Sequence, residues 1–131
     1  MSSIKTLLCR AIALGTFALG LAACGPQYDR TEITPVRGQS SLGGEVSSRR
    51  LVVPEGLVVT AHIVAWNDDN EQMPLAVRSK NPDIVEVAGV VNERNYAFLG
   101  LRTGRTEIEV IADDTLVLTV EANVTAQPAL P

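Results

Sequence analysis

The chain has 131 residues, enough for one domain of ordinary size, and its 46% hydrophobic content is sufficient to build a core. Fifteen acidic side chains outnumber eleven basic ones, and an acidic surface repels phosphate backbones, which argues against nucleic-acid binding. Removing residues 1–23, as argued below, leaves nine basic against 15 acidic side chains, a formal charge of −6.

The first 23 residues have the layout of a signal peptide. Lys5 and Arg10 supply the positive charge, and the almost wholly apolar run 11–23 follows them. The alternative is a transmembrane helix, but a bilayer core needs about 20 apolar residues, and this run has only 13 uncharged residues in all. We therefore expect 1–23 to be a signal peptide that is removed by cleavage.

The tetrapeptide Leu21-Ala22-Ala23-Cys24 distinguishes between two kinds of signal peptide. A leucine, two small residues and a cysteine resemble the lipobox of bacterial lipoproteins rather than an ordinary Ala-x-Ala cleavage site. In that family the cysteine sulfur takes a diacylglycerol group, signal peptidase II cuts before the cysteine, and the new amino terminus is usually acylated. The resemblance implies lipidation of Cys24, and two or more acyl chains suffice for stable membrane attachment.

The residue after the cysteine bears on the choice of membrane. In enterobacterial lipoproteins an aspartate there resembles an inner-membrane retention signal, whereas this chain has Gly25. We therefore expect the outer membrane, on its periplasmic or its surface face, rather than the inner membrane. Cys9 would leave with the signal peptide and Cys24 would carry lipid, so no thiol remains for a disulfide.

Residues 24–44 are expected to comprise the lipidated cysteine and a flexible tether. Residues 25–44 hold four glycines, two prolines and few apolar side chains, a composition typical of a linker. A flexible chain of this length spans about 25 Å, enough to lift a domain off the lipid surface. The alternative is that residues 32–34 add an irregular first strand to the domain.

From Glu45 onward, short alternating runs separated by turn residues predict an all-β domain over 45–124, followed by a C-terminal tail, 125–131. About seven strands indicate an immunoglobulin-like β-sandwich. The expected strands are 45–53, 57–66, 75–79, 84–88, 95–101, 105–112 and 115–124. The expected inward-facing residues are Val59, Ala61, Ile63 and Ala65 in the second strand, Ile108 and Val110 in the sixth, and Leu116, Leu118, Val120, Ala122 and Val124 in the last. Thr60, His62, Glu107 and Glu109 are expected to face outward.

Two segments carry a family resemblance. Residues 77–87, VRSKNPDIVEV, resemble the W-x-S-x-N-P-x-V-A-x-V centre of bacterial immunoglobulin-like domains of group 2. Residues 100–108, GLRTGRTEI, resemble the G-L-x-x-G-x-T-x-I segment of that family, and the likeness covers about 51–124. Val77 departs from the family pattern, because it stands where tryptophan is usual and is a smaller core residue.

Few residues are candidates for a chemical site. His62 is the only histidine, and no nucleophile motif accompanies it. The loop 67–71, with Asp68 and Asp69, could attract calcium, but its spacing is not that of an EF-hand, and a solvated turn is the simpler interpretation. We expect no catalytic, cofactor or metal site, and Cys24 is the one expected site residue.

Together these features predict a membrane-anchored envelope lipoprotein that presents a non-catalytic immunoglobulin-like interaction domain. The expected partners are the membrane, through lipid on Cys24, and a protein or glycan of the cell envelope. Two alternatives are a structural accessory subunit of a periplasmic or outer-membrane complex and a small enzyme inhibitor. Addition of a partner strand to an exposed sheet edge is one possible binding mode.

Overall fold

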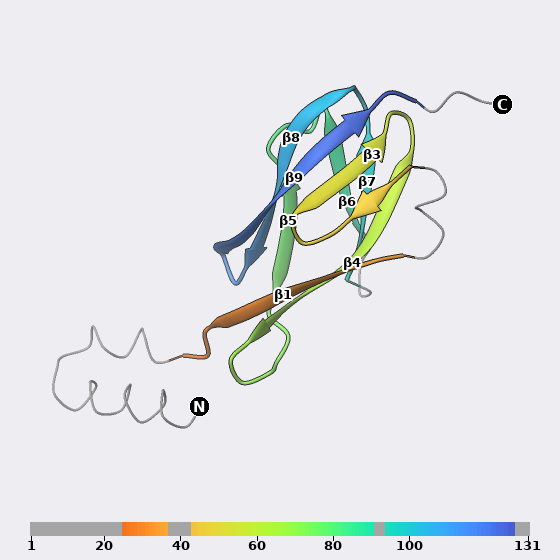
Figure 1. Ribbon diagram of the computed structural model, residues 1–131. Helices are drawn as coiled ribbons and strands as arrows, with labels where there is room; N and C mark the ends of the chain where they lie inside the picture. The colour runs from red at the N-terminus through yellow and green to blue at the C-terminus, as the bar shows by residue number, and fades with distance from the viewer. Residues whose placement is uncertain (1–24, 37–42, 91–93, 128–131) are drawn as a thin grey trace, which may run out of the picture.

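The computed structural model describes residues 25–36, 43–90 and 94–127, which form an immunoglobulin-like β-sandwich (Figure 1). The nine strands within these ranges are β1 (Tyr28–Pro35), β2 (Glu45–Val46), β3 (Arg50–Pro54), β4 (Val58–Asn67), β5 (Leu75–Ser79), β6 (Val85–Val90), β7 (Asn95–Gly100), β8 (Gly104–Ala112) and β9 (Thr115–Thr125). Over the same ranges there is no helix of the length and hydropathy needed to cross a bilayer. The predicted signal peptide and Cys24 lie outside the described residues.

The strands form two sheets that pack face to face. One sheet has the order β1-β4-β7-β6, and the other has the order β2-β3-β9-β8-β5. All neighbouring strands are antiparallel except β3 and β9, which run parallel. This parallel pair joins segments about 70 residues apart, Arg50 with Glu121 through Pro54 with Thr125, so that the last strand lies inside the second sheet rather than at its edge.

The core lies between the sheets, where the alternation of the strands places their apolar side chains. The predicted inward face of β4 is confirmed, since Val59, Ala61, Ile63 and Ala65 are all buried. Ile108 and Val110 of β8 are buried as predicted, and so are Val120, Ala122 and Val124 of β9. Phe98 of β7, a strand without an assigned inward face, also joins this core.

The first correction concerns the predicted tether. Residues 28–35 form β1, which pairs along β4 from Tyr28 opposite Asn67 to Pro35 opposite Ala61. Ile33 of β1 packs against the core, opposite Ile63. The alternative of an added first strand is therefore correct, and the folded domain begins before Glu45. Linker-like composition misled the prediction because an edge strand exposes most of its side chains and needs few apolar ones.

A second correction concerns the predicted strand 45–53, which the structure divides into β2 and β3. A tight turn separates them, because the Ser47 amide donates to the Arg50 carbonyl at 2.9 Å. The Ser47 hydroxyl oxygen in turn accepts hydrogen bonds from the amides of Arg49 and Arg50. Serine side chains favour such turns by bonding to nearby backbone.

A third correction concerns one face of β9. A β-bulge shifts the register, so that Val110 pairs with Leu118 while the next residue, Ile111, pairs with Leu116. A shift of one residue exchanges the two faces of a strand, and Leu116 is therefore 51% exposed instead of inward-facing. The tight turn predicted at Asp113-Asp114 is present, with φ of 48° and 63°, as expected for a hairpin turn of the mirror-image type.

The turns of the two segments that carry the family resemblance meet at one end of the sandwich, where the Leu101 amide donates to the Ile84 carbonyl oxygen at 2.9 Å. Asn81 begins a turn in which its carbonyl oxygen accepts hydrogen bonds from the amides of Ile84 and Val85. Gly100 lies against β3, where an added Cβ would meet the Pro54 carbonyl oxygen at 2.9 Å. Val77 stands where the immunoglobulin-like family that this segment resembles usually has tryptophan. Its side chain is half-buried and packs against the core.

Candidate functional site

The acidic loop after β4 is organised by its first residue. Asn67 is buried, and its side-chain oxygen accepts hydrogen bonds from the amides of Asp69, at 3.0 Å, and Glu71, at 2.9 Å. The Asp68 carboxylate accepts a hydrogen bond from the Gln27 amide at 3.1 Å. The loop is thus held by amide-to-oxygen bonds to its own backbone and to the residue that precedes β1. No group of three or more histidine, cysteine or acidic residues placed to hold a metal ion occurs within 25–36, 43–90 and 94–127.

His62 is exposed, as predicted, on the outer face of the first sheet. Its Nδ1 lies 3.0 Å from the side-chain oxygen of Asn95, its neighbour on β7. His62 and Asn95 therefore form a cross-strand contact on the solvent-facing side of β4 and β7.

The single tryptophan lies close to the acidic loop. Arg30 of β1 is the register partner of Trp66 on β4, and the guanidinium carbon lies 5.4 Å from the centre of the indole ring, within the range of a cation–π contact. Arg30 also bonds to Asp29, at 2.9 Å, and to Glu32, at 3.2 Å, and these hydrogen bonds raise the pKa of its guanidinium. The indole Nε1 is buried and has no hydrogen-bond partner among the described residues.

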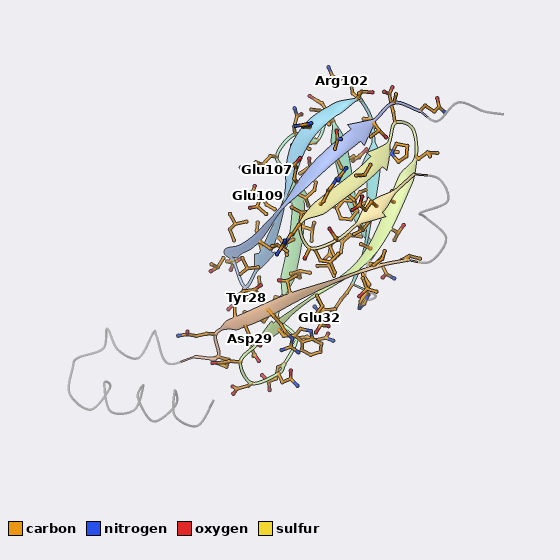
Figure 2. The ribbon with its side chains drawn as sticks, viewed as in Figure 1. Tyr28, Asp29, Glu32, Arg102, Glu107 and Glu109 are labelled. Atoms are coloured by element: carbon orange, nitrogen blue, oxygen red, sulfur yellow. The ribbon has the colours of Figure 1, made fainter. Side chains whose placement is uncertain are left out.

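The outer face of the second sheet carries both acidic and basic side chains. Figure 2 labels two of the acids, Glu107 and Glu109, on β8. Glu107 of β8 and Glu121 of β9 are direct cross-strand partners, an arrangement of like charges that is unfavourable by itself. Cations flank the pair, because Lys80 bonds to Glu107 at 2.7 Å and Arg50 is the register partner of Glu121 on the other side. The hydrogen bond from Lys80 to the Glu107 carboxylate raises the pKa of the lysine above its usual value.

Glu109 is the residue on this face that departs most from its predicted environment. Glu109 faces outward, as predicted, but is only 9% exposed, and its carboxylate accepts a hydrogen bond from Arg78 Nε at 3.0 Å. Arg78 itself remains 65% exposed at its side chain, so the pair lies at the surface of the sheet rather than in a cleft. The burial of Glu109 could have been predicted from its pairing with Arg78 on the neighbouring strand. That pairing is known only once the register of β5 and β8 is known.

The interior offers little room for a ligand. A cavity of about 10 Å³, about the space of one water molecule, lies between the sheets. Its lining is apolar apart from Ser47 and includes Ile33, Phe98 and Ile108. A cavity of this size is far smaller than a pocket that binds an organic ligand. Cys24, the one site residue expected from the sequence, lies outside the described residues.

Comparisons with known proteins support the fold. No family model matches the chain, and no curated protein matches it either. Among solved structures, domains 4 and 5 of the S-layer protein SbsC superpose with a TM-score of 0.57 at 17% identity, over 78% of this chain and 54% of that chain. Domains 1–6 of SbsC superpose with a TM-score of 0.58 at 17% identity, over 81% of this chain and 14% of that chain. FdeC, an Escherichia coli adhesin, superposes with a TM-score of 0.50 at 10% identity, over 79% of this chain and 33% of that chain. The chain thus spans about half or less of each of these structures.

Proposed function

We propose that this protein is a lipid-anchored envelope protein whose group 2-type immunoglobulin-like domain acts as a non-catalytic interaction module. The observation that carries the proposal is the lipobox-like tetrapeptide Leu21–Cys24, placed after an apolar run and directly before a β-sandwich. The chemistry requires a thiol at position 24, because the lipid is joined as a thioether to sulfur. The outer membrane is the proposed location, since Gly25 rather than aspartate follows the cysteine.

The fold supports an interaction module rather than an enzyme. The described strands pack around a core with room for about one water molecule, while the outer sheet faces present charged and polar side chains. The solved S-layer protein and the adhesin of similar fold provide an analogy of architecture alone. We propose a protein or glycan of the cell envelope as the partner.

The anchor is tested with the full chain expressed in a bacterium that processes lipoproteins. The wild-type protein should partition into the detergent phase, and Cys24→Ala should stay in the aqueous phase or retain its signal peptide. Intact-mass measurement of the processed wild type should show a diacylglycerol-modified Cys24. An unmodified Cys24 in the processed protein would refute the proposal.

The partner is tested by a pull-down from detergent-solubilised membranes. Binding of envelope glycans by the soluble domain supports an adhesive role. A stable partner protein in fixed ratio supports the role of accessory subunit instead. Inhibition of a captured enzyme by the soluble domain would assign the chain to the enzyme inhibitors.

A further inference from the structure

The start of β1 is attached firmly to the body of the domain. The Gln27 amide donates to the Asp68 carboxylate at 3.1 Å, and the Asp68 amide donates to the Gln27 carbonyl oxygen at 2.8 Å. Tyr28 then enters the sheet opposite Asn67. Gln27 is therefore part of the folded domain, and only Gly25 and Pro26 separate it from Cys24.

This short connection limits how far the domain can move from position 24. An extended chain covers at most about 3.6 Å per residue, so the three steps from Cys24 to Gln27 cover about 11 Å. The flexible tether expected from composition would have spanned about 25 Å. Pro26 reduces the freedom of the connection further, because its ring fixes φ.

The strand directions decide which loops share this end of the domain. The loop 68–73 follows β4 beside the start of β1. The Asp113 amide of the β8–β9 turn donates to the Pro74 carbonyl oxygen at 3.0 Å, which places the hairpin turn at the same end. Figure 2 shows Tyr28 near this end and Arg102 at the opposite end. In Figure 1 the arrow of β9 ends at that opposite end as well.

We propose that the end formed by loop 68–73 and the turn 113–114, hereafter the anchor end, lies against the lipid surface, so that the strands stand upright on the membrane. The proposal rests on the lipidation of Cys24 proposed above. The opposite end, with the turns at 55–56, 81–83 and 101–103, then projects outward. β9 has eleven residues at about 3.3 Å each, so the outward end lies about 35 Å farther from the lipid.

The charge of the anchor end shows what holds it at the membrane. Its loops carry Asp68, Asp69, Glu71, Asp113 and Asp114, and anionic headgroups repel such side chains. Electrostatic attraction therefore does not supply the contact. The lipid on Cys24 and the short link to Gln27 impose it, which makes the length of the link the feature to test.

The test uses the full-length lipidated protein in vesicles that contain headgroup-nitroxide lipid. Asp114→Cys at the anchor end and Arg102→Cys at the outward end each carry a fluorescent label on the new thiol. The label at 114 should be strongly quenched, and the label at 102 should keep most of its intensity, because a nitroxide quenches only fluorophores close to it and the two positions differ by about 35 Å in height. Equal quenching at both positions, or stronger quenching at 102, would overturn the proposed orientation.

A second variant tests the cause. Twelve glycine and serine residues inserted between Cys24 and Gly25 add about 19 Å of flexible chain. Quenching at 114 should then fall at least twofold, whereas unchanged quenching would refute the role assigned to the short link. Intact-mass measurement separates the two proposals: an unmodified Cys24 defeats the lipid anchor itself, and a lipidated protein with the wrong quenching pattern defeats only the orientation.

Discussion

Glu107 and Glu109 point from the same face of β8, yet the first side chain is 48% exposed and the second 11%. Alternation along the strand assigns both to the outer face, and that assignment is correct. Exposure depends further on the neighbouring strands. Glu109 lies between Arg78 of β5 and Thr119 of β9, and the arginine donates to its carboxylate. Facing outward and being exposed are therefore separate properties of a sheet residue.

Three substitutions in β8 should destabilise the domain to different degrees, according to how buried and how well bonded the replaced side chain is. Ile108→Ala should lower the free energy of unfolding by about 2–5 kcal/mol, because Ile108 is 2% exposed and its loss leaves a cavity in the core. Glu109→Ala should cost about 0.5–1.5 kcal/mol, the usual value of one hydrogen bond. Glu107→Ala should change the urea midpoint least. Urea melts of the three variants measure this order, and a glutamate variant less stable than Ile108→Ala would contradict the assigned inward face.

Gly100→Ala should destabilise the domain by about 1–3 kcal/mol, as overpacking of a filled core does. The new Cβ would meet the Pro54 carbonyl oxygen at 2.9 Å and the Cγ1 atoms of Val53 and Val124 at 3.1 Å. Gly89→Ala is the matched control, since its Cβ would meet only the Tyr96 ring at 3.5 Å. Thermal melts compare the pair. Equal melting temperatures would contradict this prediction, because they would show that β3 can shift to accommodate the methyl group without loss of stability.

At the scale of the element, β1 has the composition of a linker and the position of a strand. Most of its exposed side chains are polar or charged, and Pro35 ends it, which are features that protect an edge strand from pairing with other chains. Ile33 is its contribution to the core and lines the small cavity between the sheets. By covering β4, this strand encloses the side of the sandwich next to β2.

Removal of β1 should therefore weaken the domain. A protein of residues 45–131 should melt at a lower temperature than one of residues 25–131, because Ile63 loses its partner Ile33 and the long edge of β4 becomes free. The shorter protein should also self-associate as its concentration rises, which size-exclusion chromatography measures. If both proteins melt at the same temperature and stay monomeric, residues 28–35 do not stabilise the domain and act as a tether.

At the scale of the whole molecule, the two sheets are joined by hydrogen bonds at the end of the sandwich that holds the turns 55–56 and 101–103. The Gly56 amide donates to the Gly100 carbonyl oxygen at 2.8 Å, and the Glu55 amide donates to the Thr125 carbonyl oxygen at 2.8 Å. The Glu55 carboxylate also accepts the Thr103 hydroxyl at 2.6 Å. These bonds connect the turn after β3 with strands of both sheets and tie the sandwich into one folding unit.

Residues 25–131 should therefore fold as a single cooperative unit. They contain no cysteine, so the free energy of folding has to come from the packed core and the strand pairing. We expect a β-type circular dichroism spectrum and one unfolding transition at the same temperature with and without chelator. A chelator-dependent melting temperature would reveal a metal contribution, and two transitions would show that the sheets unfold separately.

The sequence by itself determined the features that depend on short-range patterns. Alternation identified most strands and the inward faces of β4 and β8, because side chains of a strand alternate whatever it pairs with. Turn residues located the Asn81-Pro82 and Asp113-Asp114 turns, since local side-chain chemistry and φ decide them. The expectation of lipid on Cys24 also rests on four neighbouring residues, and it stays a prediction.

Only the tertiary structure decided the features that depend on partners distant in sequence. Pairing with β4 turned residues 28–35 into a strand, and the bulge opposite Val110 and Ile111 moved Leu116 to the outer face. The neighbouring Arg78 buried Glu109. The hydrogen bonds between Gln27 and Asp68, 41 residues apart, set the length of the link to Cys24. Such contacts leave no local periodicity, because their energy is gained only when the chain brings the two segments together.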